Sequence, residues 1–157
     1  MTKILMVCLG NICRSPLAEA ILSDKLKKNG LNDIKVDSAG TSAYHIGEQP
    51  DLRTAENARK HGLEISHLVG RQFTVKDFDR FDKIYVMDNS NYNNVIELAS
   101  NEKEVDKVEM ILNILHPGLN MPVPDPYFGG ETGFENVYNL LDEACERIIL
   151  NIQKNSL

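Results

Sequence analysis

The eight residues from Cys8 to Ser15, Cys-Leu-Gly-Asn-Ile-Cys-Arg-Ser, most constrain what this chain can fold into. They follow the apolar run of residues 4–7 and lead into Pro16 and an apolar pattern with helical spacing. A strand, a tight loop and a helix start are therefore expected in succession. In α/β folds this is where anions bind, because backbone N–H groups and the positive end of the helix dipole meet there.

The residue types in this loop suit an oxyanion and a nucleophile. Gly10 and Asn11 tolerate positive φ, so the loop can curl tightly enough to aim its amides inward. Arg14 offers a planar fork of donors that can bind two oxygens of a tetrahedral anion. Cys8 opens the loop beneath such an anion, and converging amides would favour its thiolate form. The sequence thus predicts a site for phosphate or another oxyanion, formed by Leu9, Gly10, Asn11, Ile12, Cys13, Arg14 and Ser15, the last of which is also expected to cap the helix.

The rest of the chain alternates strands with helices. Strands are expected at residues 3–7, 34–38, 83–87 and 108–112, and an amphipathic helix closes the chain. The first strand-helix-strand unit implies a right-handed crossover and a parallel sheet. We therefore expect one α/β domain over residues 1–157, with a central four-stranded parallel sheet of flavodoxin-like order 2-1-3-4 and helices on both faces.

A proline-rich loop late in the chain holds the candidate proton donor. Pro122, Pro124 and Pro126 flank Asp125, which makes the segment stiff and neither strand nor helix. A general acid must be held close to its leaving oxygen. Asp125 is therefore the predicted general acid.

Composition limits partners and compartment. The net charge of −6 comes with no clustered basic face, which speaks against nucleic acid. No apolar run approaches the ~20 residues that span a bilayer, and no signal peptide is evident, so we expect a cytoplasmic protein without a membrane partner. We also expect a monomer. The three Cys suggest reduced thiols rather than a disulfide framework. No His or carboxylate cluster suggests a metal, and no cofactor is expected.

Two motifs carry a family resemblance. Val-Cys-Leu-Gly-Asn-Ile-Cys-Arg-Ser-Pro, residues 7–16, together with the distant Asp125-Pro126-Tyr127, resembles the low-molecular-weight protein tyrosine phosphatases, and the resemblance covers nearly the whole chain. Larger tyrosine phosphatases also use C-x-x-x-x-x-R, but their acid precedes the cysteine. The resemblance implies a phosphatase that hydrolyses phosphotyrosine in protein substrates through a phosphocysteine.

The implied reaction uses three catalytic residues. The Cys8 thiolate attacks phosphorus in line, Arg14 and the loop amides hold the equatorial oxygens, and Asp125 protonates the departing phenolate. Asp125, now ionised, activates the water that hydrolyses the phosphocysteine. Ser15 is expected to hydrogen-bond the thiolate and to stabilise it as the leaving group of that second step.

The resemblance also implies supporting and cleft residues. His67 is expected in a hydrogen-bond network with Asn11, Ser15 and Ser38 that braces the loop. The substrate cleft is expected to be walled by Tyr44, with Ile12, Tyr127 and Phe128 beside it. Phe128 stands where some relatives carry a second, phosphorylatable tyrosine, so that form of regulation is in question for this chain.

Cys13 lies five residues after Cys8 in the same tight loop. In so tight a loop the two sulfurs are expected to approach closely enough for a reversible disulfide, which is the pattern of a redox switch. A small residue packed behind the loop is the alternative interpretation of Cys13.

Three rival functions remain open. Arsenate reductases of this fold pass a disulfide along further cysteines, whereas this chain offers only Cys145, expected in a helix core. Protein arginine phosphatases are closer, but tend to carry a small polar residue where Ile12 stands. A non-catalytic phosphotyrosine-binding module is disfavoured because Cys8 and Asp125 are both present.

Overall fold

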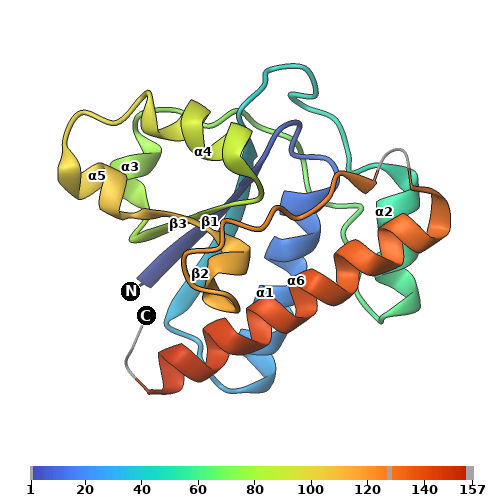
Figure 1. Ribbon diagram of the computed structural model, residues 1–157. Coiled ribbons are helices and arrows are strands. Elements are labelled where there is room, and N and C mark those ends of the chain that lie inside the picture. Colours follow the sequence, from blue (N-terminus) through green and yellow to red (C-terminus); the bar gives the residue numbers. More distant parts are fainter. Residues whose placement is uncertain (1, 127–128, 155–157) are drawn as a thin grey trace.

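The computed structural model describes residues 2–126 and 129–154, which form a four-stranded parallel sheet and the helices around it (Figure 1). The strands are β1 (Thr2–Cys8), β2 (Ile34–Gly40), β3 (Lys83–Val86) and β4 (Val108–Met110). Their order in the sheet is β2-β1-β3-β4, and every pairing is parallel. The predicted fold class and strand order are confirmed.

Helices cover both faces of this sheet. They are α1 (Arg14–Lys28), α2 (Leu52–Lys60), α3 (Asp77–Arg80), α4 (Asn89–Ile96), α5 (Glu102–Asp106), α6 (Gly130–Gln153) and the 3-10 helix η1 (Ile111–Ile114). In Figure 1, α1, α2 and α6 lie on one side of the strands, and α3 and α4 lie on the other. Helices α1 and α6 pack along each other, and α2 packs against α6.

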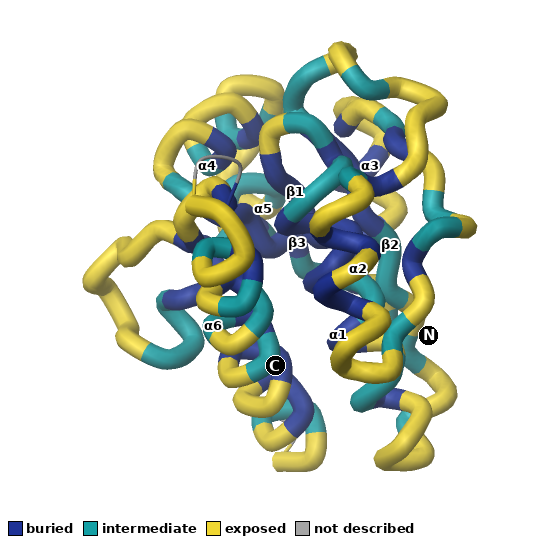
Figure 2. The backbone as a smooth tube through the Cα atoms, turned by 90° about the vertical axis from the view of Figure 1, so that its right-hand side faces the viewer, coloured by how far each residue is buried: buried dark blue, intermediate teal, exposed yellow. Residues whose placement is uncertain are grey.

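The alternation of side chains along β1 explains the two layers. Ile4 and Met6 point into a core shared with α1, α2 and α6, whereas Leu5 and Val7 point into a second core formed with α3 and α4. All four side chains are fully buried, because successive residues of a central strand face opposite sides of the sheet. Figure 2 shows buried residues along the strands and on the inward sides of the helices.

The start of the first helix differs from expectation. Helix α1 begins at Arg14 after Cys13, so Ser15 lies inside the first turn and does not cap it. The structure thus frees the Ser15 hydroxyl for other partners, because the helix begins two residues earlier than the proline suggests.

Within residues 2–126 and 129–154, none of the helices is long and apolar enough to cross a membrane.

The carboxyl ends of β1, β2 and β3 meet at one edge of the sheet, where the loops after Cys8, Gly40 and Val86 converge. This edge carries the candidate site.

Candidate active site

The loop after β1 turns its carbonyls outward. Cys8, Leu9 and Ile12 accept hydrogen bonds through their carbonyl oxygens from the amides of Thr41 (2.9 Å), Ser42 (2.9 Å) and Asp51 (2.8 Å), which lie outside the loop. In a trans peptide the N–H points opposite to the carbonyl. The amides of Leu9, Gly10 and Cys13 therefore point toward the inside of the loop.

Cys8 lies at the base of this loop, and the residue is almost fully buried. The backbone N–H of Asn11 donates to it over 3.3 Å, and the Ser15 hydroxyl lies 3.0 Å away. Hydrogen bonds from neutral donors stabilise an anion more than a neutral thiol. The surroundings of this sulfur therefore suit a thiolate.

Asn11 holds the tight point of the loop. Its φ of 58° lies in the left-handed region, as its residue type allows. The side-chain amide donates to the Ser15 hydroxyl over 2.8 Å, and its oxygen accepts the backbone N–H of Arg71 over 3.0 Å. A Cβ at Gly40 would lie 2.7 Å from the Leu9 carbonyl oxygen and 3.0 Å from the Asn11 nitrogen, so the loop rests directly on the end of β2.

Arg14 is buried, and its anchors lie on two other segments. Its Nη1 donates to Asp88 Oδ2 over 2.8 Å and to the Val123 carbonyl over 2.9 Å. Asp88 also caps α4, because its side chain accepts the Asn91 amide over 2.8 Å. The guanidinium is thus fixed in place while the side chain still lines the pocket.

Asp125 faces the same pocket as Cys8 and Arg14. Its loop is held by Val123, whose amide donates to the Met87 carbonyl over 2.8 Å and whose carbonyl binds Arg14. Val123 is buried, whereas Asp125 is exposed at the pocket wall. The chain therefore brings the nucleophile, the guanidinium and the carboxylate predicted from sequence to one cavity of about 290 Å³.

The wall of the cavity combines apolar and aromatic side chains. Ile12 and Tyr44 both line it, and Tyr44 is 88% exposed, so its ring stands at the mouth. Tyr127 and Phe128, the other predicted cleft residues, lie outside the described residues.

His45 is a wall residue that sequence reasoning missed. Its Nδ1 lies 2.9 Å from Glu48 Oε2, and a Cβ at Gly10 would lie 2.8 Å from the His45 ring. The imidazole thus packs on the loop at a position that only glycine leaves open. A lone His in a turn-rich loop gives no sequence signal of this contact.

Cys13 lines the cavity beside Cys8, and both are free thiols. Burial raises the pKa of the Cys13 thiol to about 12. Cys145 is fully buried in α6, and burial also raises the pKa of its thiol. The structure places Cys145 in the core, as the sequence predicts.

The predicted bracing network is wrong for two of its members. Ser38 donates to Glu19 Oε1 over 2.6 Å, and His67 lines a separate hollow beside Glu19. Among the described residues, neither bonds to Asn11 or Ser15. The backbone of Arg71, beside the bridge between Gly40 and Gln72 at the end of β2, donates to Asn11 instead of His67.

No group of three or more His, Cys, Asp or Glu among the described residues is arranged to hold a metal. The cavity instead offers inward amides, a guanidinium, a sulfur and a carboxylate. Such a set can bind a tetrahedral oxyanion, attack its central atom and protonate a leaving group. The class defined by this fold and site is that of cysteine-dependent phosphatases built on a parallel α/β sheet.

Comparison with known proteins names the family. The family model described as low molecular weight phosphotyrosine protein phosphatase matches residues 3–157. YfkJ of Bacillus subtilis, named a low molecular weight protein-tyrosine-phosphatase, is 40% identical, covering 98% of this chain and 97% of that protein. This chain belongs to the low molecular weight phosphotyrosine protein phosphatase family.

Solved structures agree with this assignment. A protein tyrosine phosphatase from Entamoeba histolytica, crystallised with Hepes in its active site, is similar with a TM-score of 0.93 and 37% identity over 100% of both chains. A Drosophila arginine phosphatase is similar with a TM-score of 0.88 and 35% identity, covering 96% of this chain and 98% of that one.

Proposed function

We propose that this protein hydrolyses phosphotyrosine in protein substrates through a phosphocysteine formed on Cys8. One observation carries the proposal: the Cys8 sulfur lies at the base of a loop whose amides point inward, in a cavity shared with Arg14 and Asp125. Family membership supports the same reaction class.

The first step transfers the phosphoryl group to sulfur. The Cys8 thiolate attacks phosphorus while the S–P bond forms and the P–O bond to the aryl group breaks. Arg14 and the loop amides hold the equatorial oxygens, whose charge they stabilise. Asp125 gives its proton to the departing phenolate.

The second step regenerates the thiolate. Asp125, now a carboxylate, takes a proton from a water molecule that attacks phosphorus, and inorganic phosphate leaves. The Ser15 hydroxyl, 3.0 Å from the sulfur, stabilises the departing thiolate. None of these steps requires a group beyond this chain and water.

The walls of the cavity support an aryl substrate. Ile12 and the exposed ring of Tyr44 present apolar surface above Cys8, which suits the phenyl ring of phosphotyrosine better than a planar cation. Phosphoarginine is the second candidate substrate, because this chain is similar to a Drosophila arginine phosphatase over nearly its whole length.

The two weaker candidates predict different behaviour. A thiol-dependent arsenate reductase needs an accessible cysteine beyond Cys8 and Cys13, whereas the third cysteine, Cys145, is fully buried. A binding module without activity would hold phosphotyrosine and release no phosphate.

We further propose that the protein acts as a cytoplasmic monomer. Size-exclusion chromatography with light scattering tests whether it is a monomer.

The test compares wild type with Cys8→Ser in two assays. The first measures phosphate release from phosphotyrosine peptides and from phosphoarginine, and the second measures thiol-dependent reduction of arsenate. We expect turnover of phosphotyrosine by wild type, none by Cys8→Ser, and retained phosphate binding by the variant. Turnover by Cys8→Ser at a rate near wild type would overturn the nucleophile assignment. A higher kcat/KM for phosphoarginine would overturn the substrate assignment.

A further inference from the structure

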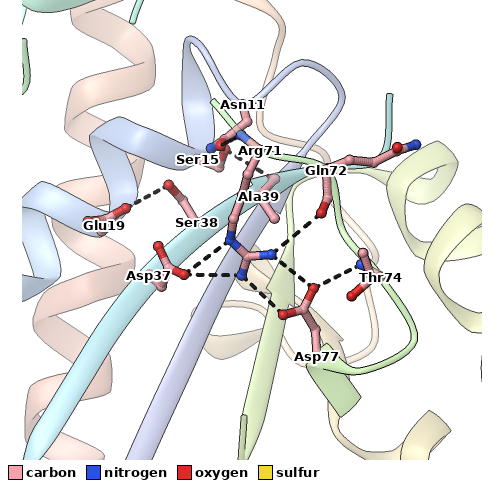
Figure 3. Close-up of polar contacts among 10 residues, drawn as sticks. All are labelled: Asn11, Ser15, Glu19, Asp37, Ser38, Ala39, Arg71, Gln72, Thr74 and Asp77. Carbon is pink, nitrogen blue, oxygen red and sulfur yellow. Dashed lines mark hydrogen bonds and ion pairs between the residues drawn. The ribbon is translucent and has the colours of Figure 1, made fainter. Parts of the chain in front are cut away.

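The side chain of Arg71 is held between two carboxylates beside the Cys8 loop (Figure 3). Its Nη1 and Nη2 donate to the two oxygens of Asp77 over 3.1 Å each. Its Nε and Nη2 donate to Asp37 Oδ2 over 3.2 and 3.1 Å. A fork that binds one carboxylate with two parallel bonds and a second from the side has little rotational freedom.

One partner in this cluster is completely buried. The Asp77 side chain is 0% exposed and also accepts the Thr74 amide over 2.9 Å. A buried carboxylate needs a partner, and its loss leaves a costly unpaired charge. The other carboxylate, Asp37, is about half exposed on β2. The cluster therefore ties α3 to β2 through one guanidinium.

The backbone of Arg71 is fixed at the same place. Its carbonyl accepts the Gly40 amide over 2.8 Å, and the Phe73 amide donates to the Gly40 carbonyl over 2.7 Å. Segment 71–73 thus runs alongside the end of β2, under the loop that Gly40 supports. The side-chain cluster and these backbone bonds set the direction of the Arg71 N–H.

The backbone N–H of Arg71 orients the side-chain amide of Asn11. It donates to Asn11 Oδ1 over 3.0 Å, which leaves the Asn11 Nδ2 to donate to the Ser15 hydroxyl over 2.8 Å. The Ser15 oxygen therefore accepts, and its own proton must go elsewhere. Cys8 Sγ at 3.0 Å is nearer than the Ala39 carbonyl at 3.4 Å.

We infer that Arg71, clamped by Asp37 and Asp77, is a positioning residue that orients Asn11 and Ser15 so that the Ser15 hydroxyl donates to the Cys8 sulfur. The inference deepens the proposed function, because it rests on Cys8 being the nucleophile. Arg71 itself need not contact substrate. Its loss would weaken one hydrogen bond to the thiolate and leave the phosphate-binding amides and Arg14 in place.

The test measures how readily Cys8 reacts at each pH. Iodoacetamide labelling of Cys8, followed by mass spectrometry from pH 4 to 9, is compared for wild type, Arg71→Ala, Arg71→Lys and Asp37→Asn. A lost hydrogen bond to the thiolate should raise the midpoint pH by about 0.5 to 1 unit in Arg71→Ala. We expect smaller rises in Arg71→Lys and Asp37→Asn, which keep part of the cluster.

Kinetics provide the second readout. We expect kcat below the new midpoint to fall by about 3- to 10-fold in Arg71→Ala, with KM changed less than about twofold. In the Asn11→Ala background, Arg71→Ala should add nothing further, since both act through one chain of contacts. Full additivity of the two midpoint shifts would overturn the inference.

Two control variants separate positioning from stability. Arg59→Ala removes an exposed ion pair with Glu64, and Ile148→Val loosens the core between α1 and α6. Both should lower the melting temperature slightly and leave the labelling midpoint unchanged. Midpoints in Arg71→Ala, Arg71→Lys and Asp37→Asn that match these controls would overturn the inference. If Arg71→Ala does not fold, the other two variants decide by the same criterion.

The outcome is separable from that of the proposed function. Labelling needs no turnover, so an unchanged midpoint with Cys8-dependent phosphate release rejects only the role of Arg71. Turnover by Cys8→Ser rejects the proposed reaction whatever the midpoints are.

Discussion

Arg14 Nη1 lies 2.8 Å from Asp88 Oδ2, an ion pair that joins the first turn of α1 to the start of α4. The two residues are 74 positions apart, and the Arg14 side chain is only 5% exposed. The carboxylate therefore acts twice, since it caps a helix and holds the guanidinium at the cavity.

Replacement of Asp88 should separate these two roles. Asp88→Ser keeps a side-chain oxygen for the α4 cap but removes the charge beside Arg14. We expect kcat/KM to fall by about 10-fold, which corresponds to roughly one charge-assisted hydrogen bond, with little change in melting temperature. Asn101→Ala, which removes the cap of α5, should lower stability and leave kcat/KM unchanged. Equal activity in Asp88→Ser and wild type would show that Arg14 needs no anchor.

Removal of the general acid should depend on the leaving group. Asp125→Asn is expected to lower kcat for phenyl phosphate by about 10² to 10⁴-fold, because the phenolate must leave unprotonated. The loss should be smaller with p-nitrophenyl phosphate, whose leaving group is already a weak base. Stopped-flow or steady-state assays of both substrates measure this difference, and Asp106→Asn on α5 serves as the charge-matched control. An equal loss with both substrates would contradict proton transfer from Asp125.

The cysteines should react in a fixed order with peroxide. The high pKa of Cys13, about 12, keeps its thiol protonated at neutral pH, so Cys8 is expected to be oxidised first. Peroxide converts the Cys8 thiolate to a sulfenic acid, and the Cys13 thiol then displaces water to form the disulfide. Mass spectrometry should find this Cys8–Cys13 bond, and dithiothreitol should restore activity.

Cys13→Ala tests the switch. Its peroxide inactivation should become largely irreversible by thiols, since no second sulfur is available to trap the sulfenic acid before further oxidation. Cys145→Ala is the control, and its recovery should match wild type. Recovery of Cys13→Ala equal to that of wild type would leave Cys13 with a packing role alone.

Glu19 should make stability depend on pH. Burial raises the pKa of its carboxyl from 4.5 to about 7, despite the hydrogen bond from Ser38. Between pH 4.5 and pH 7 the native state keeps a proton that the unfolded chain has lost. The contribution of this group to the free energy of unfolding therefore falls as pH rises through that window, by about 3 kcal/mol.

Glu19→Gln removes this titration. Urea unfolding at pH 5, 6, 7 and 8 should show a flatter pH profile for Glu19→Gln and a higher stability than wild type at pH 8. Glu56→Gln, at an exposed position of α2, should reproduce the wild-type profile. Parallel profiles for Glu19→Gln and wild type would contradict the assigned pKa.

Local patterns predicted much of this molecule. Apolar runs located all four strands, and the wrapping of residues 8–15 from strand to helix predicted the loop at the sheet edge. The proline-flanked Asp125 was expected beside Cys8, and it lines the same cavity. These features depend on neighbours in sequence or on the rule that parallel strands end at one edge.

Contacts between distant segments were beyond such patterns. The bond from Arg71 to Asn11 joins residues 60 positions apart and depends on how segment 71–73 aligns with Gly40. A single residue of slip would present another amide, so no residue type in this stretch signals the donor. His67 was placed in the network by the family resemblance alone, and no pattern in the sequence indicated that His45 packs on Gly10.

Val123 joins the proline-rich segment to two other parts of the fold by main-chain atoms alone, through the Met87 carbonyl and the Arg14 guanidinium. Both attachments use backbone groups, so they depend on where the main chain runs at this buried residue, and a change in segment length would displace them. An insertion between Val123 and Asp125 would therefore move the carboxylate away from the Cys8 sulfur. The distance between the Asp125 carboxylate and the Cys8 sulfur is thus set by the number of residues between Val123 and Asp125.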